Sequence, residues 1–150
     1  MSGPLTGFRV LDLSRVLAGP AATVLLADQG ADVIKVEPLK GDVVRAMGGG
    51  GVTPGFLTAN RGKRSVALDL KSEAGVDVVR RLASHADVFV QNFRPGAIEG
   101  MGLGEPVIRR INPAVVYVSM SGFGETGPYA HKRVYDPVIQ ALSGLADLQA

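Results

Sequence analysis

The opening segment of the chain constrains its fold more than any other. Residues 8–13 form an apolar run of strand length, residues 21–28 form an apolar run with helical spacing, and Gly30 ends the second run. A second strand, at residues 32–36, follows at once. Two strands that are joined through a helix by short connections form a right-handed parallel crossover. The opening therefore predicts a Rossmann-like sheet.

The rest of the chain continues the alternation of strands and helices. Further strands are predicted at residues 65–70, 87–90 and 115–119, and further helices at residues 72–85, 105–111 and 134–148. Ser72 is the expected cap of the first of these helices, and Val76, Val79 and Leu82 recur in it at helical spacing. Residues 38–60 contain so many glycines and prolines that we expect a long connection without a helix or strand. Because there is no repeat and no break in composition, we expect residues 1–150 to form one unit, an α/β fold with a mostly parallel sheet and flanking helices.

Charge and composition exclude several classes of function. The 16 basic residues nearly balance the 14 acidic ones, and a net charge of +2 does not supply the field that holds a nucleic acid. Cysteine is absent and the two histidines are His85 and His131, so we assign no metal site. Charged Arg9 precedes any long apolar run, so we predict no signal peptide and no membrane span, and we expect a cytoplasmic protein.

Open parallel sheets bind ligands outside the carboxyl ends of their strands. In this chain those ends lead into residues 14–20, residues 37–41, Lys71, residues 92–96 and residues 121–127. In the first of these, Gly19 and Pro20 open a helix whose free N–H groups suit a phosphate, although a tight packing turn has the same sequence. Glu37 stands where a dinucleotide-binding protein holds a ribose, but the three-glycine fingerprint is missing, so we expect a solvated carboxylate.

Two further segments carry side chains that suit a nucleotide ligand. Residues 60–64 place three cations before a strand, which fits either a phosphate site or a solvated basic turn. Asn92, Phe93 and Arg94 combine an amide, an aromatic face and a guanidinium in a loop that we expect to face the ligand. The combination is more specific than any one of its members.

Many ordered segments of the chain, rather than one motif, carry a family resemblance. They are residues 10–14, 17–20, 30–38, 41–42, 60–70, 86–88, 92–96, 102–104, 121–124 and 127–129. In this order they resemble family III coenzyme A transferases, the CaiB/BaiF type. The resemblance implies a Rossmann-like large domain joined to a smaller domain, in a homodimer of interlocked chains. Residues 1–150 then correspond to the N-terminal portion of the large domain, without the smaller domain and the C-terminal segment, as in a truncated form.

The resemblance also implies a set of contacts with coenzyme A. These contacts are Leu17, Ala18, Leu68, Lys71, Asn92, Phe93, Arg94, Arg133, Val134 and Tyr135. Two positions depart from the family pattern, because Pro38 and Gly100 stand where some members have an arginine for a phosphate. We therefore expect Lys40, Arg64 or Arg94 to bind that anion.

Family members move coenzyme A from an acyl-CoA to a carboxylic acid through an aspartate, and the resemblance implies the same reaction here. The aspartate attacks the thioester to form an anhydride, and the released thiolate returns to form an enzyme thioester before the acceptor acid takes the coenzyme. This aspartate matches a position beyond residue 150, and Asp136 matches only a supporting acid. We therefore expect the 150 residues alone to be inactive, and the donor and acceptor are left open.

Three alternatives compete with this interpretation. The first is a module that binds coenzyme A or dimerises without catalysis. The second is an acyl-CoA racemase, which is disfavoured because Tyr135 stands where related racemases have a histidine, and tyrosine, with a pKa of about 10, is a poor base. The third is an NAD-type oxidoreductase, which the missing glycine fingerprint disfavours.

Overall fold

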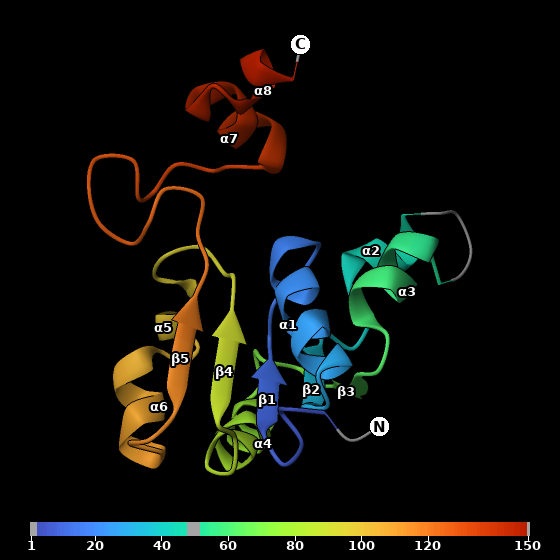
Figure 1. Cartoon of the computed structure of the whole chain (residues 1–150). Coiled ribbons are helices and arrows are strands. Elements are labelled where there is room, and N and C mark those ends of the chain that lie inside the picture. Colours follow the sequence, from blue (N-terminus) through green and yellow to red (C-terminus); the bar gives the residue numbers. More distant parts are fainter. Residues whose placement is uncertain (1–2, 48–51, 150) are drawn as a thin grey trace.

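Five parallel strands form one sheet in the computed structural model, which describes residues 3–47 and 52–149 (Figure 1). Their order is β3-β2-β1-β4-β5, and every pairing between them is parallel. The strands are β1 (Arg9–Asp12), β2 (Asp32–Glu37), β3 (Arg64–Ala67), β4 (Val88–Gln91) and β5 (Val116–Ser119). The predicted Rossmann-like α/β fold is confirmed, and the described sheet is parallel throughout.

Helices cover both faces of this sheet (Figure 1). α1 (Ala18–Asp28) lies on one face and packs against α3 (Pro54–Asn60). On the other face, α4 (Glu73–Ala83) packs against α6 (Glu105–Ile111), and the short helix α5 (Ala97–Gly100) joins the same layer. Among the helices that the structure describes, none is long and apolar enough to cross a membrane.

The apolar core is divided between the two faces of the sheet. The larger cluster lies against α4, α5 and α6, and its members include Leu11, Ile34, Val79, Phe89 and Ile108. The smaller cluster lies under α1 and consists of Val10, Ala31, Val33 and Val90. Successive strand residues point to opposite faces, and here both faces are covered. The central strands β1, β2 and β4 are therefore mostly buried on both faces, whereas the edge strands β3 and β5 keep exposed residues.

The start of α4 follows its predicted signals closely. The hydroxyl of Ser72 accepts a hydrogen bond from the N–H of Gly75 at 3.1 Å, as expected for a residue that caps a helix. Val76 and Val79 recur at helical spacing, and both are buried. The predicted cap and the predicted apolar face of α4 are confirmed.

Residues 38–60 contain two short helices, so the expectation of a connection without helices or strands was wrong. The first, α2 (Val43–Ala46), begins after Asp42, whose carboxylate accepts a hydrogen bond from the helix backbone at 3.1 Å. The second, α3, begins after Thr53, whose hydroxyl accepts one at 3.2 Å. Such caps satisfy N–H groups that a short helix otherwise leaves free. The glycine run at residues 48–51 lies outside the described residues.

After β5 the chain leaves the sheet, and we call residues 121–149 the C-terminal arm. The helix predicted at residues 134–148 is two helices, α7 (Asp136–Ser143) and α8 (Leu145–Leu148), so that prediction was wrong in its start and its continuity. Gly144 between them has a φ of 78°, a left-handed conformation that ends α7. The two helices pack against each other and lie clear of the sheet, and neither contains a buried residue (Figure 1).

Candidate functional site

The carboxyl ends of β1 and β4 are the point at which the strand order reverses, and this position is named the crevice here. These strands are neighbours, but the chain leaves β1 for α1 on one face of the sheet and leaves β4 for α5 on the other. A reversal of this kind separates the two outgoing segments and is where open parallel sheets bind their ligands. The segments are residues 13–17, here named the β1 loop, and residues 92–96, here named the β4 loop.

The two loops are tied together by one amide side chain. Asn92 accepts a hydrogen bond from the N–H of Arg15 through Oδ1, and donates one to the carbonyl of Arg15 through Nδ2, both at 2.8 Å. The guanidinium carbon of Arg15 lies 4.9 Å from the centre of the Phe93 ring, within the range of a cation–π contact. Asn92 and Phe93, which the sequence analysis named, thus form one unit with the β1 loop.

Gln91 supports this unit from inside the sheet, although it is not among the site residues predicted from the sequence. The side chain is buried, and its Oε1 accepts a hydrogen bond from the N–H of Phe93 at 2.7 Å. Its Nε2 donates to the hydroxyl of Ser119 at 2.7 Å, which joins the ends of β4 and β5. The sequence did contain a signal for this role, because Gln91 is the polar last residue of an otherwise apolar strand. A polar side chain that is buried there requires hydrogen-bond partners.

The β1 loop contains a strained residue shortly before α1 begins. Val16 has a φ of 66°, and it is the one residue other than glycine with positive φ in the part of the chain that the structure describes. Leu17 and Ala18 follow it and are exposed, Leu17 at 62%. No side chain caps the first turn of α1, so the N–H groups of this turn face the same edge as the crevice. The loop thus presents Leu17 and Ala18 outward, as their predicted role requires.

Asp12, at the end of β1, is the centre of a buried polar cluster under α1. Its carboxylate accepts hydrogen bonds from the N–H of Ser14 at 2.9 Å and from the hydroxyl of Thr23 at 2.6 Å. The ammonium of Lys63 donates to the same carboxylate at 3.0 Å and to the carbonyl of Pro20 at 2.9 Å. Burial lowers the pKa of Lys63, although the charge of Asp12 acts in the opposite direction. The cluster anchors the first turn of α1 to the sheet.

The basic turn before β3 is largely solvated, as one of its two interpretations expected, because the side chains of Arg61 and Arg64 are exposed and only that of Lys63 is buried. Lys63 is occupied by the cluster around Asp12, and Arg61 pairs with Asp28. Arg64 pairs with Asp32 at 2.7 Å. These two residues begin β3 and β2, so their pair lies at the amino edge of the sheet, opposite the crevice. Arg64 is therefore not placed to bind the anion for which it was considered.

Glu37 is buried rather than solvated, which corrects a second expectation. It is 2% exposed, and Arg45 donates to both of its carboxylate oxygens, at 2.6 and 2.7 Å. The hydroxyl of Ser65 and the N–H of Asp42 complete its partners. Burial by itself raises the pKa of Glu37, but the hydrogen bonds from Arg45, Ser65 and Asp42 outweigh it and lower the pKa to about 2. Glu37 is a structural carboxylate, not a ribose contact.

A cavity of about 290 Å³ opens beside the β1 loop. It is lined from two sides, by the β1 loop and by the segment that runs from the end of β2 through α2: Arg15, Pro38, Lys40, Gly41, Asp42, Val43 and Ala46. Pro38, where the resemblance led us to consider an arginine, is in this wall. The cations of the cavity are Lys40, which the sequence analysis named, and Arg15, which it did not. Their charges make the cavity suitable for an anion.

Three other predicted contacts lie at the carboxyl edge. Lys71 follows β3 and is exposed, as is Arg94 in the β4 loop. Leu68 is half-buried and packs against the larger core, so part of its role is structural. The cations Lys71 and Arg94 are thus available to a ligand at this edge.

The last predicted residues, Arg133, Val134, Tyr135 and Asp136, belong to the C-terminal arm. Val134 packs closely against Gly122, where a methyl group would lie 2.0 Å from its Cγ1. Tyr135 is 76% exposed, and Asp136 accepts a hydrogen bond from a side chain one turn later in α7. Figure 1 shows α7 beyond the carboxyl edge of the sheet, clear of the strands. The structure therefore brings the β1 and β4 loops together and leaves these four residues on the arm.

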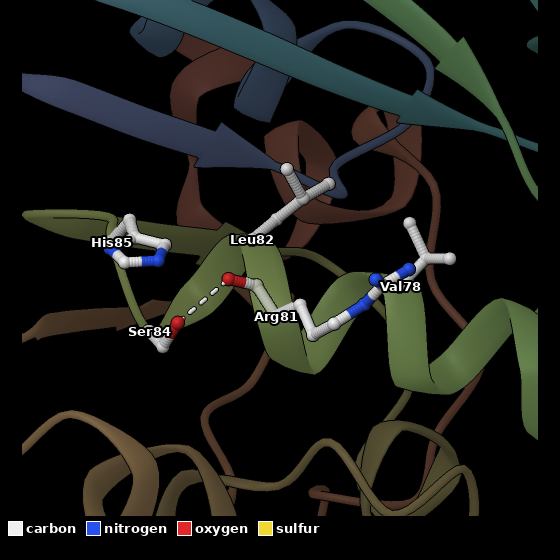
Figure 2. Close-up of a pocket in the computed structure, with 5 residues that line it drawn as sticks. All are labelled: Val78, Arg81, Leu82, Ser84 and His85. Carbon is white, nitrogen blue, oxygen red and sulfur yellow. Dashed lines mark hydrogen bonds between the residues drawn. The ribbon is translucent and has the colours of Figure 1, made fainter.

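A second hollow, of about 410 Å³, lies at the end of α4 (Figure 2). It is lined by Val78, Arg81, Leu82, Ser84 and His85. The end of α4 leads into the start of β4, so this hollow lies toward the amino edge of the sheet. Ser84 donates to the carbonyl of Arg81 at 2.8 Å, which is a local bond of the helix end. The lining contains none of the predicted contacts, and we assign no site to it.

A Rossmann-like sheet with two loops joined across its reversal point defines an α/β protein built to bind a ligand at the carboxyl edge. The family model described as CoA-transferase family III matches residues 5–150. The chain belongs to this family. The resemblance inferred from the sequence is thus confirmed.

Named relatives agree with the family. The succinyl-CoA:glutarate CoA-transferase of Mus musculus is 49% identical over 146 residues, which cover 95% of this chain and 34% of that protein. The succinate–glutarate CoA-transferase of Agrobacterium fabrum is 46% identical over 155 residues, which cover 97% of this chain and 39% of that protein. The crystal structure of a CaiB/BaiF family protein from Brucella suis has a TM-score of 0.94 at 43% identity, over 98% of this chain and 41% of that one. The chain thus spans about a third of the length of the first of these relatives.

Proposed function

We propose that this chain forms the coenzyme A-binding loops of a transferase that moves coenzyme A between an acyl-CoA and a carboxylic acid. The observation that carries the proposal is the tie between Asn92 and the backbone of Arg15, which holds the β1 and β4 loops across the crevice. Membership of CoA-transferase family III supports coenzyme A as the ligand. A crevice of this kind, with phenyl and cationic side chains around it, suits an adenine nucleotide.

In the proposed complex the residues divide into three roles. Leu17 and Ala18 supply exposed apolar and backbone surface at the start of α1, and Phe93 supplies an aromatic face for the adenine. Lys71 and Arg94 supply positive charge for the phosphates, with Lys40 and Arg15 in the adjacent cavity. Arg133, Val134 and Tyr135 stay predicted contacts, and they require the C-terminal arm to approach the crevice. The supporting role of Asp136 depends on the same approach.

The proposed chemistry proceeds through an aspartate that the resemblance matches beyond residue 150. Its carboxylate attacks the acyl-CoA carbonyl, so that an anhydride forms and the thiolate leaves; the thiolate then attacks the aspartyl carbonyl and releases the donor acid. The acceptor carboxylate attacks the resulting enzyme thioester, so that a second anhydride forms and the thiolate leaves; the thiolate then attacks the acceptor's carbonyl, which gives the new acyl-CoA and releases the aspartate carboxylate. We therefore expect no transfer by the 150 residues alone. An interlocked homodimer and a cytoplasmic location are parts of the same proposal.

We propose dicarboxylic acids as the class of donor and acceptor. The relatives from mouse and Agrobacterium fabrum are named for succinyl-CoA or succinate together with glutarate. The test is transfer from succinyl-CoA to glutarate, compared with transfer to butyrate, in the protein at the full length of these relatives. Equal rates with the two acceptors would remove the dicarboxylate preference.

Calorimetric titration of the 150-residue chain with coenzyme A tests the binding proposal. We expect saturable binding, weakened about tenfold or more by Lys71→Ala and by Arg94→Ala, because each removes a charged contact with a phosphate. Arg81→Ala is the matched control, because it removes an exposed cation near the amino edge and is expected to leave the affinity unchanged. Equal losses of affinity in all three variants would show that binding depends on net charge alone, and would contradict specific contacts from Lys71 and Arg94.

Transfer assays on the 150 residues and on the full-length protein together separate the transferase proposal from the alternatives. A chain that binds coenzyme A without turnover fits both the proposed role and a binding or dimerising module, and turnover in the full-length protein then favours the transferase. Exchange of an α-proton of an acyl-CoA, without any acid acceptor, would instead favour a racemase. Saturable binding of NADH that coenzyme A does not displace would favour an oxidoreductase.

A further inference from the structure

Lys35 is a buried lysine that joins two separate segments at the carboxyl edge. It is 1% exposed, and its ammonium donates to the carbonyl of Ser14 at 2.9 Å. The same ammonium lies 3.2 Å from the carboxylate of Asp42, whose side chain is equally buried. Oδ2 of Asp42 accepts no hydrogen bond from the described residues, so the charge of Lys35 is what compensates it. One side chain thus holds the β1 loop and the start of α2.

The two segments held by Lys35 are the two walls of the 290 Å³ cavity. Ser14 directly precedes Arg15 in one wall, and Asp42 belongs to the other wall, next to Gly41. Lys35 is not among the residues that line the cavity. It connects the walls from within the sheet, so it is placed to set their separation without contact with a ligand.

The β1 loop requires such support because of the conformation of Val16. A β-branched residue at a φ of 66° persists only where its surroundings hold it. The carbonyl of Ser14 is held by Lys35, and the backbone of Arg15 is held by Asn92. If either support is lost, we expect the backbone at Val16 to relax to an unstrained conformation. Leu17 and Ala18 would then no longer be held in their present positions.

We propose that Lys35 is a positioning residue for ligand binding, which acts through the carbonyl of Ser14 and the carboxylate of Asp42. The identity of the ligand in this proposal rests on the proposed coenzyme A site. The effect of Lys35 on the β1 loop can be measured without any ligand. Lys35 keeps the β1 loop and the start of α2 at the separation that the ligand requires. Affinity for coenzyme A therefore depends on a side chain that the coenzyme does not touch.

The test uses amide hydrogen exchange at Arg15 in the 150-residue chain without ligand. In the wild type the bond from Lys35 to the carbonyl of Ser14 is in place, so we expect slow exchange at Arg15. Lys35→Met/Asp42→Asn removes that bond without leaving a buried charge unpaired, and we expect exchange roughly ten to a hundred times faster. Should Lys35→Met alone fail to fold because Asp42 is left unpaired, the double variant carries the test.

Ile108→Ala is the control for lost stability, because it removes core volume in α6 and leaves the bonds of Lys35 and Asn92 to the β1 loop in place. We expect it to lower the melting temperature and to leave exchange at Arg15 slow. Equal acceleration in Ile108→Ala and in the double variant would overturn the proposal, as would slow exchange in the double variant.

Titration with coenzyme A adds the functional arm of the test. We expect the dissociation constant of Lys35→Met, or of the double variant, to rise about tenfold, and that of Ile108→Ala to stay at the wild-type value. If the wild-type chain binds no coenzyme A, the proposed function fails while the exchange result still decides the positioning role. If the wild type binds and the Lys35 variants bind equally well, the positioning role fails alone.

Discussion

At the scale of single residues, the carboxyl edge of the sheet is held by charges that solvent does not reach. Asp12, Lys35 and Glu37 are each at most 2% exposed. A buried charge is tolerated when it is paired and hydrogen-bonded, and removal of one partner leaves the other uncompensated. Each of these residues has its partner in a different segment of the chain. They therefore shape the site by holding its loops, and their substitution is expected to reduce stability.

Glu37 makes the stability of the chain depend on pH in the acid range. Its pKa is lowered to about 2 in the folded state from an ordinary value of 4.5. The ionised carboxylate thus contributes stability above pH 4.5, and this contribution is lost as the pH falls toward 2. We expect Glu37→Gln to lower the free energy of unfolding at neutral pH by roughly 1–3 kcal/mol. The difference from the wild type should shrink below pH 4.5.

Urea unfolding of both proteins at a series of pH values measures this difference. Asp77→Asn is a suitable control, because the pair of Asp77 with Arg80 is an exposed pair within α4 and contributes little. A difference between Glu37→Gln and the wild type that stays constant from neutral pH down to the acid range would contradict the role of the ionised carboxylate.

At the scale of elements, the β1 loop and the first turn of α1 approach each other so closely that only glycine fits. A methyl group at Gly19 would lie 2.2 Å from Cβ of Ser14 and 2.4 Å from its hydroxyl oxygen. The sequence fitted two roles for the turn at Gly19 and Pro20, a phosphate site or a tight packing turn. The close approach to Ser14 confirms the packing role. This contact couples the position of α1 to the position of the β1 loop.

We expect Gly19→Ala to separate α1 from the β1 loop. The overlap with Ser14 forces a backbone shift that costs about 1–3 kcal/mol of stability, and the shift should also weaken coenzyme A binding through Leu17 and Ala18. Thermal unfolding and titration measure the two effects. Gly100→Ala is the matched control, because no atom lies within 4 Å of the added methyl group and its φ is not positive. Wild-type behaviour of Gly19→Ala would show that the loop yields without cost.

At the scale of the whole molecule, the C-terminal arm leaves apolar surface uncovered. The exposed apolar side chains of α7 and α8 are Val138 (45%), Leu142 (64%), Leu145 (43%) and Leu148 (84%). Monomeric proteins rarely expose contiguous apolar patches of large size. This surface is consistent with an arm that packs against further protein.

We therefore expect the 150-residue chain to associate with itself and to bind the dye ANS. Leu142→Glu together with Leu148→Glu should reduce both, because the charges make burial of the arm costly. Leu57→Glu is the control, because Leu57 is exposed to a similar extent, 57%, but lies on α3. Sedimentation velocity measures association. A monodisperse monomer without ANS binding would be incompatible with this expectation.

The sheet was predictable from the sequence, whereas the segment after β2 was not. The order of strands and helices follows from apolar runs that local sequence displays, and Ser72 marked the start of α4 by the same local logic. The helices α2 and α3 depend on single capping residues, Asp42 and Thr53, inside a segment rich in glycine and proline. A single capping residue is weak evidence for a helix in the sequence, because the same residue types also occur in turns and loops.

The site divides in the same way. Local sequence and family resemblance together named Asn92 and Phe93, because chain order alone brings the ends of parallel strands to one edge. The sequence did not show that Glu37 is buried or that Lys63 is drawn to Asp12, because each of these charges finds its partner in another element: Arg45 of α2 for Glu37, and Asp12 of β1 for Lys63. The sequence by itself determined the fold and the family, since both depend on local patterns in a fixed order. Only the tertiary structure decided which charges face a ligand and which hold the loops, because pairing and burial depend on distances between segments that the sequence does not contain.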